Sequence, residues 1–123
     1  MPNALIDTGL LLDYLAGDAA ARAAIDGCAH CSISVISWLD VMALCPPALL
    51  DETRAWLRTL ERLSVSEAIA DEAHRLMLRK PGLGRARALV WASAVANQLV
   101  WLTGDASCVE AGDRNVWVVG GPG

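Results

Sequence analysis

The sequence is short of basic residues and of long apolar runs. Its 123 residues carry ten Lys and Arg against 14 Asp and Glu, which gives a net charge of −4. This balance is evidence against a broad basic surface of the kind that holds nucleic acid by charge alone, and it leaves a local basic groove as the alternative. No apolar run is long enough to cross a membrane, and the first residues lack the pattern of a secretory leader. We therefore expect a cytoplasmic protein with no membrane partner.

Aromatic residues are also scarce, with no Phe and a single Tyr. The tryptophans are therefore expected to fill the core rather than to stack on nucleic-acid bases; they are Trp38, Trp56, Trp91, Trp101 and Trp117. Trp38 is the tryptophan of most interest, because it lies two residues before Asp40, near the expected site. The main basic residues are expected on solvated helix faces without a role in phosphate binding; they are Arg54, Arg58, Arg62, Arg75, Arg79 and Lys80.

Cysteine is too sparse for a zinc site of the usual kind. Cys28 and Cys31 have the C-x-x-C spacing of redox and zinc motifs, but Cys45 and Cys108 stand alone. No second pair completes a set of four ligands. We interpret all four as reduced thiols without a chemical role. A redox protein that uses Cys28 and Cys31 is the alternative.

What the chain does contain is an alternation of apolar strands and helices. Strands are expected near residues 4–6, 32–36, 63–65, 99–102 and 115–119, with helices between them. Thr8 and Ser37 are expected to cap the helices that follow the first two strands. No linker or repeat divides residues 1–123, so we expect a single domain. The order predicts an α/β protein with a parallel sheet covered on both faces.

Two of the predicted strands end in an isolated acid. Asp7 follows the first strand, and Asp105 follows the strand at residues 99–102. Asp40 lies one turn into the helix after the second strand. Because open α/β sheets bind their ligands outside the carboxyl ends of the strands, the three acids are expected at one edge of the sheet.

Three carboxylates at one edge repel one another unless a cation neutralises them. Oxygen ligands suit Mg²⁺ or Mn²⁺, and such a site can activate water for the hydrolysis of a phosphodiester. The alternative, from the residues alone, is that Asp40 is a solvated helix residue and Asp105 a turn former.

Four segments of the chain carry a family likeness. They are residues 5–15 (LIDTGLLLDYL), 33–41 (ISVISWLDV), 87–94 (RALVWASA) and 99–105 (LVWLTGD). Each is weak alone, but the four in this order resemble the PIN-domain family, specifically the small VapC-like toxins of bacterial toxin–antitoxin pairs. The resemblance covers almost the whole chain. It implies a three-layer α/β/α fold with a central parallel sheet of four to five strands.

The resemblance also implies a function and a site. The function is metal-dependent cleavage of RNA by a protein that pairs with an antitoxin-like partner and forms a homodimer. The implied catalytic residues and ligands of Mg²⁺ or Mn²⁺ are Asp7, Asp40 and Asp105, with Asp40 where the family usually has Glu. Thr8, Thr103 and Ser107 are expected beside these acids, and Ser107 stands where the family has a more variable acid.

Arg87 stands where the family has a further aspartate. It falls in the first turn of its helix, where the helix dipole disfavours a cation. A guanidinium there would be stabilised by facing the three acids, which it can bind bidentately, and it would then occupy the place of the metal. The alternative is that Arg87 extends into solvent and the acids still bind metal weakly. Arg85 is close enough that a shift of one residue in the alignment would exchange their roles.

These observations predict two functions. The first is a Mg²⁺- or Mn²⁺-dependent endoribonuclease weakened by Arg87. The second is a catalytically inactive PIN pseudo-nuclease, without a metal, that acts as a protein- or RNA-binding module.

Overall fold

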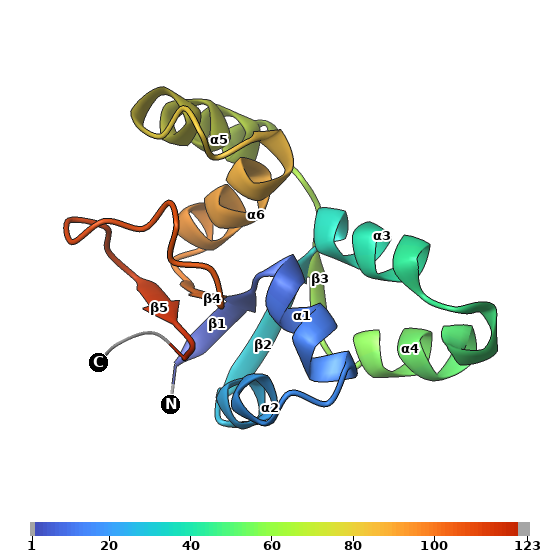
Figure 1. Cartoon of the computed structure of the whole chain (residues 1–123). Coiled ribbons are helices and arrows are strands. Elements are labelled where there is room, and N and C mark those ends of the chain that lie inside the picture. Colours follow the sequence, from blue (N-terminus) through green and yellow to red (C-terminus); the bar gives the residue numbers. More distant parts are fainter. Residues whose placement is uncertain (1, 121–123) are drawn as a thin grey trace.

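The computed structural model describes residues 2–120, which contain a five-stranded sheet with all neighbouring strands parallel (Figure 1). The strands lie in the order β3-β2-β1-β4-β5, so β1 is central. Their bounds are β1 Asn3–Ile6, β2 His30–Ser34, β3 Glu61–Leu63, β4 Val100–Thr103 and β5 Val116–Val118.

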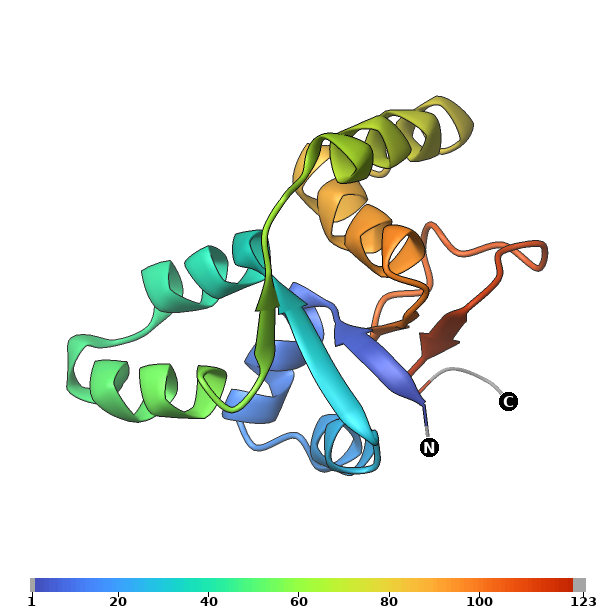
Figure 2. The same cartoon turned by 180° about the vertical axis from the view of Figure 1, so that it is seen from behind.

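Helices cover both faces of this sheet (Figures 1 and 2). One face carries α1 (Thr8–Leu15), α2 (Ala19–Asp26), α3 (Val35–Leu44) and α4 (Leu50–Leu57), the last preceded by a short 3₁₀ turn at Pro47–Leu49. The other face carries α5 (Glu67–Arg79) and α6 (Arg85–Ala96). The predicted α/β/α fold with a parallel sheet is confirmed. No helix within residues 2–120 is both long and apolar enough to cross a membrane.

Strand periodicity divides the core into two layers. Successive side chains of a strand point to opposite faces, so Leu5 of β1 packs with α5 and α6, while Ala4 and Ile6 pack with α1 to α4. In β4, Trp101 and Leu102 divide in the same way. All five side chains are at most 1 % exposed. The strand ends that carry the acids are therefore held by a core on both sides.

Two helix caps differ from the prediction. Asp7, and not Thr8, caps α1, since its carboxylate accepts a hydrogen bond from the Thr8 N–H. Ser34, and not Ser37, caps α3 through the N–H of Ile36. β2 therefore ends two residues earlier than predicted, because the β-branched residues after Ser34, which favour a strand, lie in the first turn of α3. β3 is likewise displaced, to residues 61–63.

The tryptophans only partly follow the prediction of a core role. Trp91 and Trp101 are buried, with their rings stacked at a centroid distance of 4.5 Å. Trp38 and Trp56 are half-buried against the other layer. Trp117 is 54 % exposed, so the prediction is wrong for this residue. It lies on β5, an edge strand, and no element within residues 2–120 covers its ring fully.

Lys80 was predicted on a solvated helix face, and this is wrong. It follows α5 and is 7 % exposed. Its Nζ donates to Asp113 Oδ2 at 2.8 Å and to Glu110 Oε1 at 3.0 Å, and it lies 5.2 Å from the ring centroid of Trp91. The lysine thus ties the segment between β4 and β5 to the core, a long-range contact without a signal in the local sequence.

Candidate functional site

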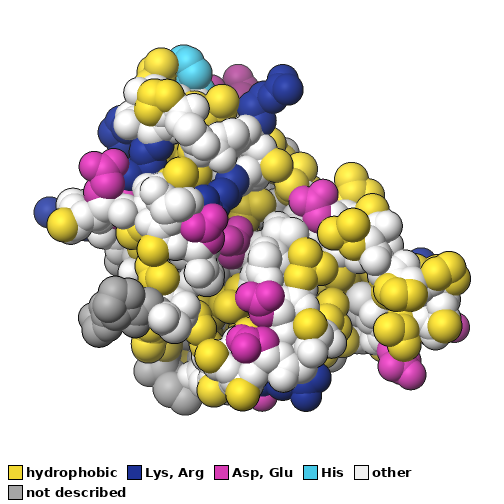
Figure 3. Space-filling view, viewed as in Figure 1, with side chains coloured by type: hydrophobic (Ala, Val, Ile, Leu, Met, Phe, Trp, Pro, Cys, Tyr) yellow, Lys and Arg dark blue, Asp and Glu magenta, His cyan; other side chains and the backbone are white. Residues whose placement is uncertain are grey.

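The carboxyl edge of the sheet holds a cavity of about 290 Å³ lined by the three predicted acids. Asp7 follows β1, Asp40 lies in α3, and Asp105 follows β4, so segments far apart in the chain bring them together. Arg87 of α6 lines the same cavity. On the face drawn in Figure 3, acidic side chains adjoin basic ones beside α6. We call this space the acidic cavity; its other lining residues are Thr8, Gly9, Ala86 and Val90.

Asp7 is the most buried of the acids, at 7 % exposed. Its Oδ1 accepts from the Thr8 N–H at 3.0 Å, and its Oδ2 accepts from the Thr103 hydroxyl at 2.7 Å. Burial raises the pKa of Asp7, although the Thr103 hydrogen bond and the charge of Arg87 act to lower it. The ionised form of Asp7 is therefore costly and favours a nearby cation.

Asp105 has a different environment, with 58 % of its side chain exposed. Its Oδ1 accepts from the Ser107 N–H at 2.9 Å, and this backbone hydrogen bond is the main reason why its pKa is lowered. The Asp105 N–H donates to the Thr103 hydroxyl at 3.1 Å. Thr103 therefore links the two acids, since its hydroxyl donates to Asp7 and accepts from Asp105.

Arg87 turns into the acidic cavity rather than out to solvent. Its Nη1 lies 3.2 Å from Asp105 Oδ2, its Nη2 donates to the Asp105 carbonyl at 2.8 Å, and 19 % of its side chain is exposed. The guanidinium carbon lies 5.2 Å from the ring centroid of Trp101. Within residues 2–120 its only ion pair is with Asp105. The Nε of Arg87 is buried and has no hydrogen-bond partner there.

Asp40 is half-buried and lines the cavity, and within the described chain its carboxylate accepts no hydrogen bond. No three His, Cys, Asp or Glu side chains in residues 2–120 are placed so that they could hold one metal ion. The carboxylate oxygens are of the kind that Mg²⁺ and Mn²⁺ prefer, but Asp105 already forms an ion pair with Arg87. With Arg87 in this position, the arrangement does not fit a bound divalent ion.

The residues predicted beside the acids all contact the site. Thr8 and Ser107 give their N–H groups to Asp7 and Asp105, and Thr103 bridges the two. Sequence reasoning missed Ser37, whose buried hydroxyl lies 2.8 Å from that of Thr8. Its position in an expected cap gave no signal for this contact. The hydroxyl pair fixes the start of α1 against α3, on which Asp40 lies.

The cysteines show no sign of redox chemistry. All four are free thiols. Burial raises the pKa of Cys31 to about 11 and also raises that of Cys28. A redox cysteine needs a lowered pKa, because the thiolate is the reactive form. These shifts disfavour the alternative that Cys28 and Cys31 form a redox centre.

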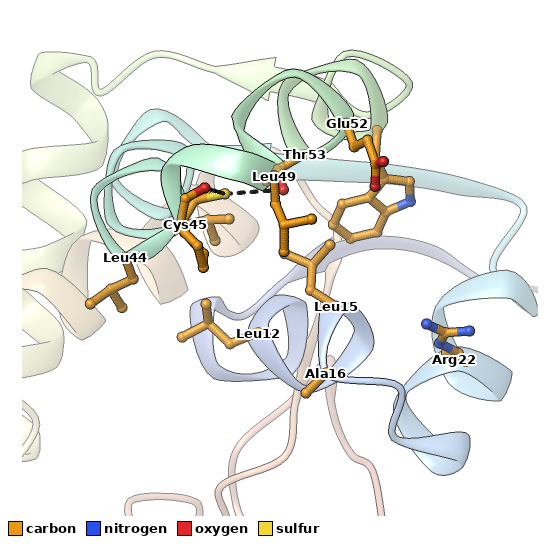
Figure 4. Close-up of a pocket in the computed structure, with 12 residues that line it drawn as sticks. Leu12, Leu15, Ala16, Arg22, Leu44, Cys45, Leu49, Glu52 and Thr53 are labelled. Carbon is orange, nitrogen blue, oxygen red and sulfur yellow. Dashed lines mark hydrogen bonds between the residues drawn. The ribbon is translucent and has the colours of Figure 1, made fainter.

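A separate apolar cavity of about 440 Å³ opens between α1, α3 and α4 (Figure 4). Its rim exposes Leu44 at 68 %, Leu49 at 46 % and Leu15 at 38 %. The Cys45 thiol donates to the Thr53 hydroxyl at 3.2 Å across its upper wall. Exposed leucines gathered around an opening are typical of a surface that binds another protein.

No protein-family model matches the sequence, and no curated protein sequence matches it. Solved structures do. A chain of a toxin–antitoxin complex from Klebsiella pneumoniae has a TM-score of 0.87 and 27 % identity, over 94 % of this chain and 97 % of that one. DNA-bound VapBC from Salmonella typhimurium gives a TM-score of 0.72 at 18 % identity, over 87 % and 89 % of the two chains. FitAcB from Neisseria gonorrhoeae gives a TM-score of 0.76 at 17 % identity, over 93 % of this chain and 96 % of that one.

The chain has a PIN-like fold, which it shares with chains of toxin–antitoxin complexes. The fold that the resemblance of four short sequence segments implied is thus confirmed over nearly the whole chain. The Salmonella and Neisseria structures, at below 20 % identity, support the fold alone. Within this PIN-like fold, the acidic cavity lies at the carboxyl edge of the sheet, where open α/β sheets bind their ligands.

Proposed function

We propose that this PIN domain is the toxin-type subunit of a toxin–antitoxin pair, and that its acidic cavity is a weakened Mg²⁺- or Mn²⁺-dependent endoribonuclease site. The observation that carries the proposal is the placement of Asp7, Asp40 and Asp105 around one cavity at the carboxyl edge of the sheet. The similar chain from Klebsiella pneumoniae, part of a toxin–antitoxin complex, supports the pairing.

The weakness of the site follows from Arg87. Its guanidinium is charged at every ordinary pH and pairs with the carboxylate of Asp105. A divalent ion entering the cavity meets this charge and has to compete with it for Asp105. Asp7, buried and hydrogen-bonded by Thr103, is the acid that gains most from a cation. Activity therefore requires Arg87 to leave Asp105.

The proposed partner is an antitoxin-like protein. The apolar cavity between α1, α3 and α4 supports this proposal, because its exposed leucines would lose contact with water on binding. Arg22 and Glu52 at the same cavity add one charge of each sign for specificity. We further expect a cytoplasmic homodimer, with RNA as the substrate.

The second candidate is a pseudo-nuclease that binds a protein or RNA without cleavage. The ion pair between Arg87 and Asp105 favours it, since that contact already supplies a cation to the acids. The two functions agree on the fold and the partner, and they differ in whether the native protein takes up a divalent ion.

The deciding experiment combines calorimetric titration with Mn²⁺ and an RNA cleavage assay. The proposal expects binding at millimolar Mn²⁺ and slow cleavage that Asp7→Asn abolishes. Glu52→Gln is the matched control, because it removes one acid from the apolar cavity and leaves the acidic cavity unchanged. If the native protein neither binds Mn²⁺ nor cleaves RNA, the nuclease is contradicted and the pseudo-nuclease takes its place.

A further inference from the structure

A second polar cavity, of about 340 Å³, lies where α3, α4 and β3 meet. Figure 2 shows these three elements side by side at the β3 edge of the sheet. We call it the arginine cavity, because half of its lining residues are arginines. The lining residues are Trp38, Arg54, Leu57, Arg58, Leu60 and Arg62. The three arginines are exposed, as predicted, but Arg62 lies on β3 and not on a helix face, and the three line one cavity.

None of these arginines forms an ion pair within residues 2–120. Glu61, the acid next to Arg62, pairs with His30 at 2.6 Å instead. Arg54 and Arg58 are four residues apart at the end of α4, a spacing at which like charges repel. Three uncompensated positive charges therefore share one cavity in a chain whose net charge is −4. A bound anion would relieve this repulsion.

Trp38 orders the cavity. The guanidinium carbon of Arg62 lies 4.6 Å from the ring centroid of Trp38, a cation–π contact. Stacking of this kind holds the flat guanidinium in place and leaves the N–H groups at its rim free to bind an anion. An arginine held in this way is suited to phosphate, whose oxygens it can bind two at a time.

The arginine cavity adjoins the acidic cavity through α3. Trp38 lines the first and Asp40 the second, and residues two apart on a helix face different sides. The two cavities therefore lie on different sides of the same helix, whose diameter with side chains is about 10 Å. An extended polynucleotide that crosses α3 would contact both.

We propose that the arginine cavity binds backbone phosphates of single-stranded RNA, a proposal that rests on the ribonuclease function proposed above. Phosphate is favoured over carboxylate because a single strand carries one phosphate on every nucleotide and can engage several of the three guanidinium groups at once, as in the positively charged grooves that hold single strands. The cavity would hold the strand on one side of α3 while the acids lie on the other.

The test is fluorescence anisotropy with a short labelled single-stranded RNA in EDTA, so that binding is measured without cleavage. We expect Arg54→Gln/Arg58→Gln to weaken binding at least tenfold. The slope of log affinity against log salt should fall by about 1.4, since each lost phosphate contact on a single strand contributes about 0.7. Arg75→Gln/Arg79→Gln on α5 is the control with the same change of charge, and it should leave the slope unchanged. Thermal melting checks that both variants are folded.

The proposal is overturned if the α4 and α5 variants weaken binding equally. It is also overturned if a glutamate-rich peptide of equal charge displaces the RNA as well as unlabelled RNA does, because the ligand would then be an acidic protein. Its failure is distinct from that of the nuclease. Loss of Mn²⁺-dependent cleavage does not affect binding in EDTA, and cleavage can be present when the arginine variants bind RNA normally.

Discussion

The guanidinium carbon of Arg87 lies 5.2 Å from the ring centroid of Trp101, while its Nη1 lies 3.2 Å from the Asp105 carboxylate. The side chain is thus held on two sides at the mouth of the site. A partly desolvated cation–π contact contributes about 1–2 kcal/mol, and an ion pair to an exposed acid contributes up to about 1 kcal/mol. A divalent ion would have to compete with both contacts for Asp105, so we expect Arg87 to lower the affinity of the proposed site for metal.

Replacing Arg87 by an acid should therefore strengthen metal binding. Arg87→Asp removes the ion pair and adds a fourth carboxylate to the cavity, so we expect Mn²⁺ affinity to rise at least tenfold in calorimetric titration. Arg85→Asp is the matched control, since it makes the same change of charge on an exposed residue in the same helix turn. Equal gains from both variants would mean that net charge alone controls the affinity.

The Thr103 hydroxyl should contribute more to the stability of the fold than an ordinary hydrogen bond does. Thr103→Val keeps the shape of a fully buried side chain but removes the donor to Asp7 and the acceptor for the Asp105 N–H. Leaving a buried carboxylate without its donor costs about 1–3 kcal/mol. We expect that loss in urea denaturation, together with a further rise of the pKa of Asp7 followed by NMR. Thr59→Val, at an exposed hydroxyl, should cost less than about 1 kcal/mol.

Much of the fold and of the candidate site could be predicted from local sequence, and the rest depends on contacts between distant segments. The apolar run before Asp7 and the order of strands and helices are local, and they were sufficient to predict the parallel sheet and the acidic edge. The end of β2 was misplaced because Ile36 suits a strand as well as a helix. The burial of Lys80 and the gathering of Arg54 with Arg62 depend on tertiary packing that no local pattern contains.

The buried carboxylate of Asp7 should make the fold less stable as it ionises. Burial raises its pKa, so the native state binds this proton more tightly than the unfolded chain. Stability is then fully present below the ordinary aspartate pKa of 3.8 and is lost as the pH rises through the raised value. Asp7→Asn, which keeps the oxygen acceptor but cannot ionise, should melt at a higher temperature than the native protein at pH 7. The difference should vanish below pH 3.8.

The control for this prediction is Asp40→Asn, which removes a carboxylate from the same cavity at a half-buried position. We expect its melting temperature at pH 7 to change less than that of Asp7→Asn. A lower melting temperature for Asp7→Asn at pH 7 would show that the charged hydrogen bonds of Asp7 outweigh its burial.

The buried Lys80 should be the main support of the segment between β4 and β5. Lys80→Met keeps the length of the side chain but leaves Asp113, whose side chain is 15 % exposed, without its cation. Burial acts to raise the pKa of Asp113, but the hydrogen bonds from Lys80 and from the Glu110 N–H outweigh it, and the pKa is lowered. We expect a loss of about 2–3 kcal/mol at pH 7 in urea denaturation.

The pH dependence and a second variant identify the cause of that loss. Because the folded pKa of Asp113 lies below its ordinary value, its contribution is present above pH 3.8 and is lost as the pH falls through the lowered value. The difference in the free energy of unfolding between the native protein and Lys80→Met should therefore disappear at acid pH. Lys80→Met/Asp113→Asn should regain most of the stability at pH 7, because it removes the unpaired charge. The control is Arg79→Met, at the exposed neighbouring position, which should change the free energy of unfolding by less than about 0.5 kcal/mol. A double variant no more stable than Lys80→Met would place the loss in the contact between Lys80 and the Trp91 ring instead.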